Sequence, residues 1–133
     1  MATVTTKLTL SSTDLTTDSL DVAITKQLTI AGPSQSFRMA IDSSSSDLVA
    51  DHLIAAAASY TKSYILLHNT ATDASHIISI GDDTNGDATL EEINIVLGAG
   101  EWGWFPWDST RDLVADAAAG TPVLSVMIMQ VAA

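Results

Sequence analysis

The segment from Gly81 to Glu92 has the oxygen-bearing side chains whose spacing comes closest to a metal-binding motif. Asp83, Asn85 and Glu92 occupy the third, fifth and twelfth positions of an EF-hand calcium loop, and Gly86 occupies the sixth. The first position is Gly81, where the motif needs an acidic ligand, and neither flank has helical periodicity. We therefore predict an acidic turn between strands, with a bound calcium ion as the alternative.

Histidines offer a second candidate for metal binding. His68 and His76 flank a polar turn, so their imidazoles could approach each other across two strands, with Asp73 as an oxygen ligand. His52 lies in an unrelated segment, and the chain has no HExxH motif. A polar loop end is the simpler interpretation, so we expect neither a metal nor any other cofactor.

Patterns typical of enzymes are weak in this chain. The serine run over residues 43–46 has no nucleophile-elbow sequence around it, and Gly98-Ala99-Gly100 lacks the Lys-Ser/Thr of a phosphate-binding loop. The adjacent carboxylates Glu91 and Glu92 point to opposite faces of a strand, which does not suit a glycosidase pair. We expect a protein that is not an enzyme.

All three tryptophans of the chain lie in one short segment. On a strand, Trp102 and Trp104 share one face, and Phe105 and Trp107 share the other, unless Pro106 bends the chain. One interpretation is a platform on which sugar rings stack. We favour a second, in which these rings fill the core or a contact between subunits, so that all three tryptophans stabilise the domain or its interface.

The composition limits what these residues can belong to. The chain has 133 residues, 47% of them hydrophobic, and 5 Lys and Arg against 16 Asp and Glu give a net charge of −11. An acidic surface repels phosphate groups and anionic lipids, so we expect no binding to nucleic acid or membranes. Cysteine is absent, and we find no signal-peptide pattern and no apolar stretch long enough for a transmembrane helix.

Apolar residues recur with period two along most of the chain, which indicates strands. The clearest run covers residues 20–30, where Lys26 interrupts the apolar face and predicts a bulge or an edge; a second strand follows Gly32-Pro33. Residues 60–80 have the pattern of a hairpin, and residues 47–59 could contain one brief helix. Further strands are expected over residues 90–97, 102–107, 113–115 and 123–131.

Strands of this length and spacing predict an all-β chain, an antiparallel, jelly-roll-like β-sandwich with about eight or nine strands and at most one short helix. We expect a single domain over residues 1–133. The last strand is apolar on both faces, with Val126 and Ile128 on one and Met127 and Met129 on the other. It should lie in the middle of a sheet or at a subunit contact, so we expect a homo-oligomer, for example a trimer.

Three stretches of the second half share a further pattern. Residues 60–70 have the pattern of an aromatic-rich strand that ends in Asn69-Thr70. In residues 97–107, an apolar residue and small residues are followed by Gly-Glu, then by aromatic residues and a Phe-Pro pair. Residues 112–117 and 120–124 have the pattern of a closing pair of strands. In these stretches the chain resembles small accessory virion proteins of tailed bacteriophages, which are β-sandwich proteins that decorate heads or complete tails. The resemblance carries no catalytic residues.

The resemblance implies a virion structural protein that is made in the host cytoplasm. The first expectation is a capsid decoration or cement protein that binds the capsid lattice and stabilises it through self-association. The alternatives are a tail or fibre component, or a glycan-binding β-sandwich that uses residues 102–107. The partners implied are copies of the chain itself and a major capsid or tail protein. The position of the tryptophans discriminates between assembly and sugar binding.

Overall fold

The computed structural model describes residues 1–14, 20–43, 52–56, 61–84 and 90–132. These residues form nine strands and no helix, so none of them belongs to a helix able to cross a membrane. The strands are β1 (Ala2–Ser12), β2 (Leu20–Ala40), β3 (His52–Ala55), β4 (Ser63–Asn69), β5 (Ile78–Asp83), β6 (Glu92–Leu97), β7 (Trp102–Trp107), β8 (Asp112–Ala117) and β9 (Val123–Val131).

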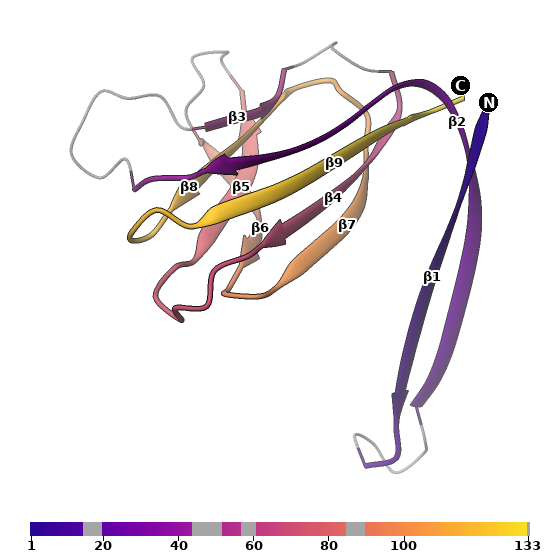
Figure 1. Ribbon diagram of the computed structural model, residues 1–133, viewed down its shortest axis with the longest axis horizontal. Helices are drawn as coiled ribbons and strands as arrows, with labels where there is room; N and C mark the ends of the chain where they lie inside the picture. Colours follow the sequence, from indigo (N-terminus) through magenta and orange to yellow (C-terminus); the bar gives the residue numbers. More distant parts are fainter. Residues whose placement is uncertain (15–19, 44–51, 57–60, 85–89, 133) are drawn as a thin grey trace.

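The strands form two antiparallel sheets that pack face to face (Figure 1). The five-stranded sheet has the order β1-β2-β9-β4-β7, and the four-stranded sheet has the order β3-β8-β5-β6. Without β1, the orders β2-β9-β4-β7 and β3-β8-β5-β6 are those of an eight-stranded jelly roll. The prediction of an all-β antiparallel sandwich of eight or nine strands is confirmed.

The core lies between the two sheets and follows from the period-two alternation of its strands. Ile65 and Leu67 of β4 and Ile128 of β9 are fully buried on the inner face of the five-stranded sheet. Ile78 and Ile80 of β5 cover them from the four-stranded sheet. Strand β9 lies between β2 and β4, which confirms its predicted position in the middle of a sheet.

Residues 60–80 do not form the predicted hairpin. Strand β4 pairs with β7 and β9 in one sheet, whereas β5 pairs with β6 and β8 in the other, so the loop between β4 and β5 crosses the sandwich. Alternation shows that a segment is a strand, but it does not show which sheet the strand joins. The hairpin prediction was wrong because Asn69, where this loop begins, binds other segments of the chain.

Gly32-Pro33 does not divide two strands, contrary to the prediction. Strand β2 runs without a break from Leu20 to Ala40, first beside β1 and then beside β9. Its register against β9 shifts between Ile30 and Ser34, so Pro33, which has no N–H to donate, lies where the ladder is already irregular.

The brief helix expected over residues 47–59 is wrong where the structure describes this stretch. Residues 52–55 form β3, which pairs with β8. Residues 47–51 and 57–59 of the expected helix lie outside the described residues. The first strand, β1, was not predicted at all.

Asn69, at the end of β4, joins the two sheets. Its side chain is fully buried; Nδ2 donates to the carbonyl oxygens of His76 at 2.8 Å and Leu97 at 3.1 Å, and Oδ1 accepts from the amide of Ala71 at 3.1 Å. Thr70, the next residue, donates from both its amide and its hydroxyl to the carbonyl of Val123. The Asn-Thr pair therefore connects the crossing loop, β6 and the start of β9.

Asn69→Asp should destabilise the fold, because a carboxylate cannot donate to the two carbonyl oxygens and would be buried beside them. We expect a loss of about 3 kcal/mol in the free energy of unfolding, measured by urea denaturation. Thr72→Asp adds a carboxylate at an exposed position of the same loop and should change stability by less than about 0.5 kcal/mol. Equal stability of the two variants would contradict the role of Asn69.

Candidate functional site: an apolar outer face and a projecting arm

The outer face of β9, β4 and β7 is apolar and aromatic, although it faces away from the core. The register places Trp104 of β7, Leu66 of β4 and Met127 of β9 in one row across the three strands. Tyr64 and Met129 are partners in the adjacent row, and the rings of Tyr64 and Trp104 stack with centroids 5.4 Å apart and planes at 26°. We call these residues, with Trp102, the outer face.

The other sheet is less apolar on its outer side: β6 exposes Ile93 and Val96, but the central strands present polar side chains. On the side of β5 and β8 that faces away from the core, Ser79 and Asp116 are register partners. A sandwich in water needs apolar residues only on the two inner faces of its sheets. The outer face is therefore an apolar surface that the fold itself does not require.

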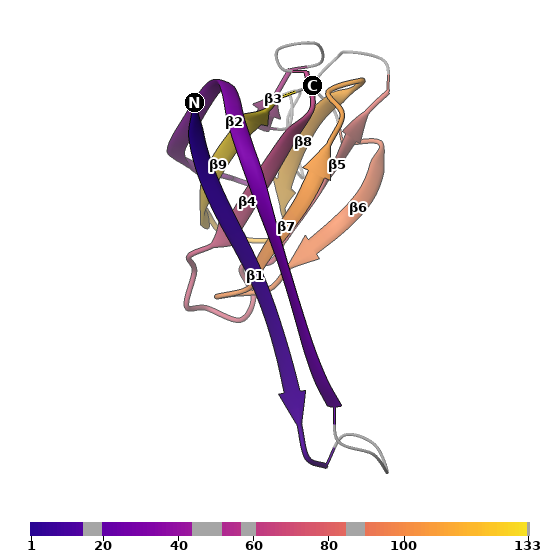
Figure 2. The same cartoon turned by 90° about the vertical axis from the view of Figure 1, so that its right-hand side faces the viewer.

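A two-stranded arm projects from the body beside the outer face. We define the arm as β1 together with residues 20–30 of β2, which pair over 11 positions. Figure 2 shows that the arm runs beyond the lower end of the sandwich. Its base is packed, because Leu28 is 4% exposed, whereas Ile24 is 58% exposed and Leu10 is 47% exposed. The arm thus leaves the body with large apolar side chains in solvent.

A groove separates the arm from the outer face and has a volume of about 720 Å³. Lys26 reaches across it, with its ammonium 5.9 Å from the ring centroid of Tyr64, a distance typical of a cation–π contact. Lys26 pairs regularly with Thr6, so the bulge expected there is absent. The edge is present, because residues 20–28 of β2 pair only with β1. The arm groove is lined by Val4, Thr6, Lys7, Leu8, Ile24, Lys26, Tyr64, Leu66, Trp102, Gly103, Trp104, Met127 and Met129.

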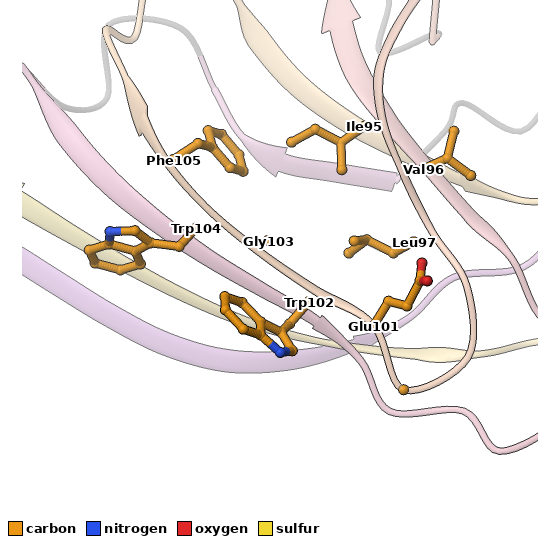
Figure 3. Close-up of a pocket in the computed structure, with 9 residues that line it drawn as sticks. Ile95, Val96, Leu97, Glu101, Trp102, Gly103, Trp104 and Phe105 are labelled. Carbon is orange, nitrogen blue, oxygen red and sulfur yellow. The ribbon is translucent and has the colours of Figure 1, made fainter. Parts of the chain in front are cut away.

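A second groove lies between β6 and β7, where the edges of the two sheets meet, and has a volume of about 560 Å³. Figure 3 shows Phe105 on the side of β7 toward Ile95, whereas the indoles of Trp102 and Trp104 point away from it. Glu101 supplies the carboxylate of this groove, and its Oε2 accepts a hydrogen bond of 2.7 Å from the amide of Gly98. That acid therefore supports the turn before β7.

The structure divides the predicted site residues into two groups. Trp107, Val126 and Ile128 belong to the core, and Phe105 packs against it. The remaining four lie together in the arm groove: Trp102, Trp104, Met127 and Met129. The two faces predicted for the tryptophan strand are therefore present, with Trp107 8% exposed and Trp102 60% exposed.

Sequence reasoning missed the residues that the arm contributes. Val4, Leu8 and Leu10 alternate with threonine and lysine along β1, and this period-two pattern is a strand signal that would have found them. The register then pairs Leu8 with Ile24 and Leu10 with Val22. The strand pattern of these residues could be recognised in the sequence, but the sequence did not show that they lie outside the sandwich.

A basic side chain lies near the carboxylates on either side of the expected acidic turn. The Arg111 guanidinium lies 3.6 Å from a carboxylate oxygen of Asp82 and 3.7 Å from one of Glu92. Gly81 lies at a register shift between β5 and β6, where an added side chain would collide with the carbonyl of Glu92; this explains why the first ligand of the calcium motif is missing. Residues 85–89 lie outside the described residues.

The histidines do not form the cluster that was considered. His68 is exposed on β4, and His76 lies in the loop that crosses to the other sheet. Within the described ranges, no group of three His, Cys, Asp or Glu side chains could hold a metal ion.

Two exposed carboxylates have shifted acidities. The backbone amide and hydroxyl of Ser75 donate to Asp73 and lower the pKa of its carboxyl, and the hydroxyl and amide of Thr110 do the same for Asp108. Each carboxylate caps a turn, and neither lines a groove. Their turns are more stable with the carboxylate ionised, and that contribution is lost as the pH falls through the lowered pKa.

The three tryptophans should differ in their effect on stability. Trp107→Ala removes a buried ring from the core and should cost about 3–5 kcal/mol in the free energy of unfolding. Trp102→Ala removes a mostly exposed ring and should cost less than about 1 kcal/mol in the monomer. Urea denaturation at low protein concentration measures both, and equal losses would contradict the division between core and outer face.

Chelation should leave the melting temperature unchanged, because Arg111 already places a positive charge between Asp82 and Glu92. The measurement is thermal unfolding with and without EDTA. A fall of many degrees on adding EDTA, reversed by calcium, would show that the loop binds a metal.

No family model matches the sequence, no curated protein matches it, and no solved structure matches it. The arm and the outer face are the features of this chain on which a functional proposal can be built.

Proposed function

We propose that this chain is a structural protein that assembles with copies of itself and with a larger scaffold, and that it carries out no catalysis. The observation that carries the proposal is the arm, which extends beyond the body with Leu8, Leu10 and Ile24 in solvent. An isolated two-stranded ribbon is at best marginally stable in water. An arm of this length with an apolar face is therefore expected to gain its stability from a contact.

The outer face adds a second apolar surface next to the arm. Trp102 is 60% exposed and Met127 is 37% exposed, on strands whose other side already fills the core. Contiguous exposed apolar surfaces mark sites of protein–protein interaction in proteins that otherwise bury such residues. Large aromatic residues and methionine are also the types enriched at interfaces.

The particle that we propose is the virion of a tailed bacteriophage, in which the chain serves as a capsid decoration or cement protein on the major capsid protein. This step rests on the resemblance of residues 60–133 to accessory virion proteins. Asn69-Thr70 and Phe105-Pro106 of this chain are similar to an Asn-Thr turn and a Phe-Pro pair in those proteins. Jelly rolls are frequent in viral capsid domains, which supports the proposal, although fold alone does not determine function. A tail or fibre location is the alternative within the same class.

A glycan-binding module is the second candidate, and the exposure of Trp102 favours it. Jelly rolls also occur in lectins, and an exposed indole is a common platform for sugar rings. Trp104 is a poorer platform than Trp102, because its ring is half-buried and stacked on Tyr64. A sugar site needs polar groups that fix the hydroxyls, and the described residues that line the arm groove include no carboxylate or carboxamide. Assembly therefore remains the better-supported proposal.

The proposal predicts that the protein is a component of purified particles. Mass spectrometry of virions from cells that make this protein should find it enriched over the host cytosol, and the purified chain should sediment as a self-associating species. Absence from particles, together with a strictly monomeric chain at high concentration, would overturn the proposal. If the chain also binds a glycan array, and Trp102→Ala abolishes that binding without changing sedimentation, the lectin hypothesis replaces it.

A further inference from the structure

The two faces of the arm differ in chemistry. Register partners along the ribbon place Leu8 with Ile24 and Leu10 with Val22 on one face. On the opposite face, Thr9 pairs with Ala23 and Lys7 pairs with Thr25. The arm is therefore an amphipathic ribbon with one mainly apolar face, interrupted by the Thr6–Lys26 pair near the base, as if it were one half of a sandwich.

The body of the same copy covers only the part of this face near the base. Leu8 and Ile24 line the arm groove, but they are 41% and 58% exposed, and Leu10 and Val22 lie beyond the groove. Figures 1 and 2 show that the arm diverges from the sandwich toward its tip. A surface that covers the tip must therefore come from another molecule.

From this geometry we propose that the partner of the arm is the arm of a second copy, packed apolar face to apolar face; the proposal rests on the self-association proposed above. Two identical amphipathic ribbons supply the two layers that a small sandwich requires. The contact is two-fold symmetric, since each ribbon offers the same face to the other. Leu8, Leu10, Val22 and Ile24 of both copies form its centre.

The distribution of charge favours contact between arms over contact between bodies. Residues 1–32 contain two lysines and three aspartates, whereas residues 33–133 contain three cations and 13 acidic residues. Two bodies with this excess of negative charge repel each other at close range. Contact through the nearly neutral arms keeps the acidic bodies apart.

The size of the contact predicts its strength. A ribbon of 11 paired positions presents a face of about 35 by 10 Å, and the body covers the part near the base, so two ribbons bury less than roughly 700 Å² together. Interfaces that are stable between two free proteins usually bury more than about 1,000 Å². The contact between arms is therefore weak between free copies and becomes strong when a scaffold holds many copies close together.

Engineered cysteines test the proposal without background cross-linking, because the chain has no native cysteine. Leu8→Cys, Leu10→Cys, Val22→Cys and Ile24→Cys each place one thiol on the apolar face. Thr9→Cys and Thr25→Cys place one on the opposite face of the same strands and serve as matched controls. Each variant is oxidised over a range of protein concentrations, and disulfide-linked dimers are measured on non-reducing gels.

At least one apolar-face variant should give about tenfold more linked dimer than the controls, because a disulfide forms only where two Cβ atoms come within about 4 Å. Equal yields on the two faces, or no dimer from any apolar-face variant, would overturn the contact between arms. If the wild-type chain still self-associates and enters particles in that case, the proposed function stands and only this partner surface is wrong. If cross-links form but the chain is absent from particles, the proposed role in the virion fails and the contact between arms stands.

Discussion

The carboxamide of Asn69 makes the hydrogen bonds on which the closure of this jelly roll depends. Strand β4 ends in one sheet and β5 begins in the other, so the chain has to cross the sandwich at a point where backbone carbonyls would otherwise be buried without donors. One buried amide supplies donors to the carbonyls of His76 and Leu97 and accepts from Ala71. Its own backbone also bonds to Gly100 and Glu101 in the turn before β7. The strand that carries the tryptophans is therefore positioned by the same residue that closes the core.

The fold class could be predicted from the sequence because alternation is a local signal. Strand β9 was expected over residues 123–131 and lies there, since both of its faces are apolar and a turn marks its start. The sheet to which each strand belongs is not a local property. Residues 60–80 look like a hairpin by pattern, but long-range pairing, together with the bonds of Asn69 and Thr70, places β4 and β5 in different sheets.

About half of the candidate site could be predicted from the sequence. Trp102, Trp104, Met127 and Met129 were singled out by residue type and do lie together, because the register of β4 with both β7 and β9 brings their strands side by side. The arm was not foreseen, since Gly32-Pro33 was taken as a break and no strand was assigned to residues 2–12. A proline in an irregular stretch of one long strand has the same sequence signal as a proline between two strands, so the pairing partners decide between them.

The continuity of β2 also determines how a mechanical load would pass through the molecule. The same strand forms half of the arm and then lies beside β9 in the middle of the five-stranded sheet (Figure 1). In an antiparallel pair the hydrogen bonds are perpendicular to the strands, so a pull along β2 stretches many of them at once in shear. A pull perpendicular to an edge strand would instead break its bonds one after another. Tension applied at the arm therefore passes along β2 to its ladder with β9, in the direction in which that ladder resists it best.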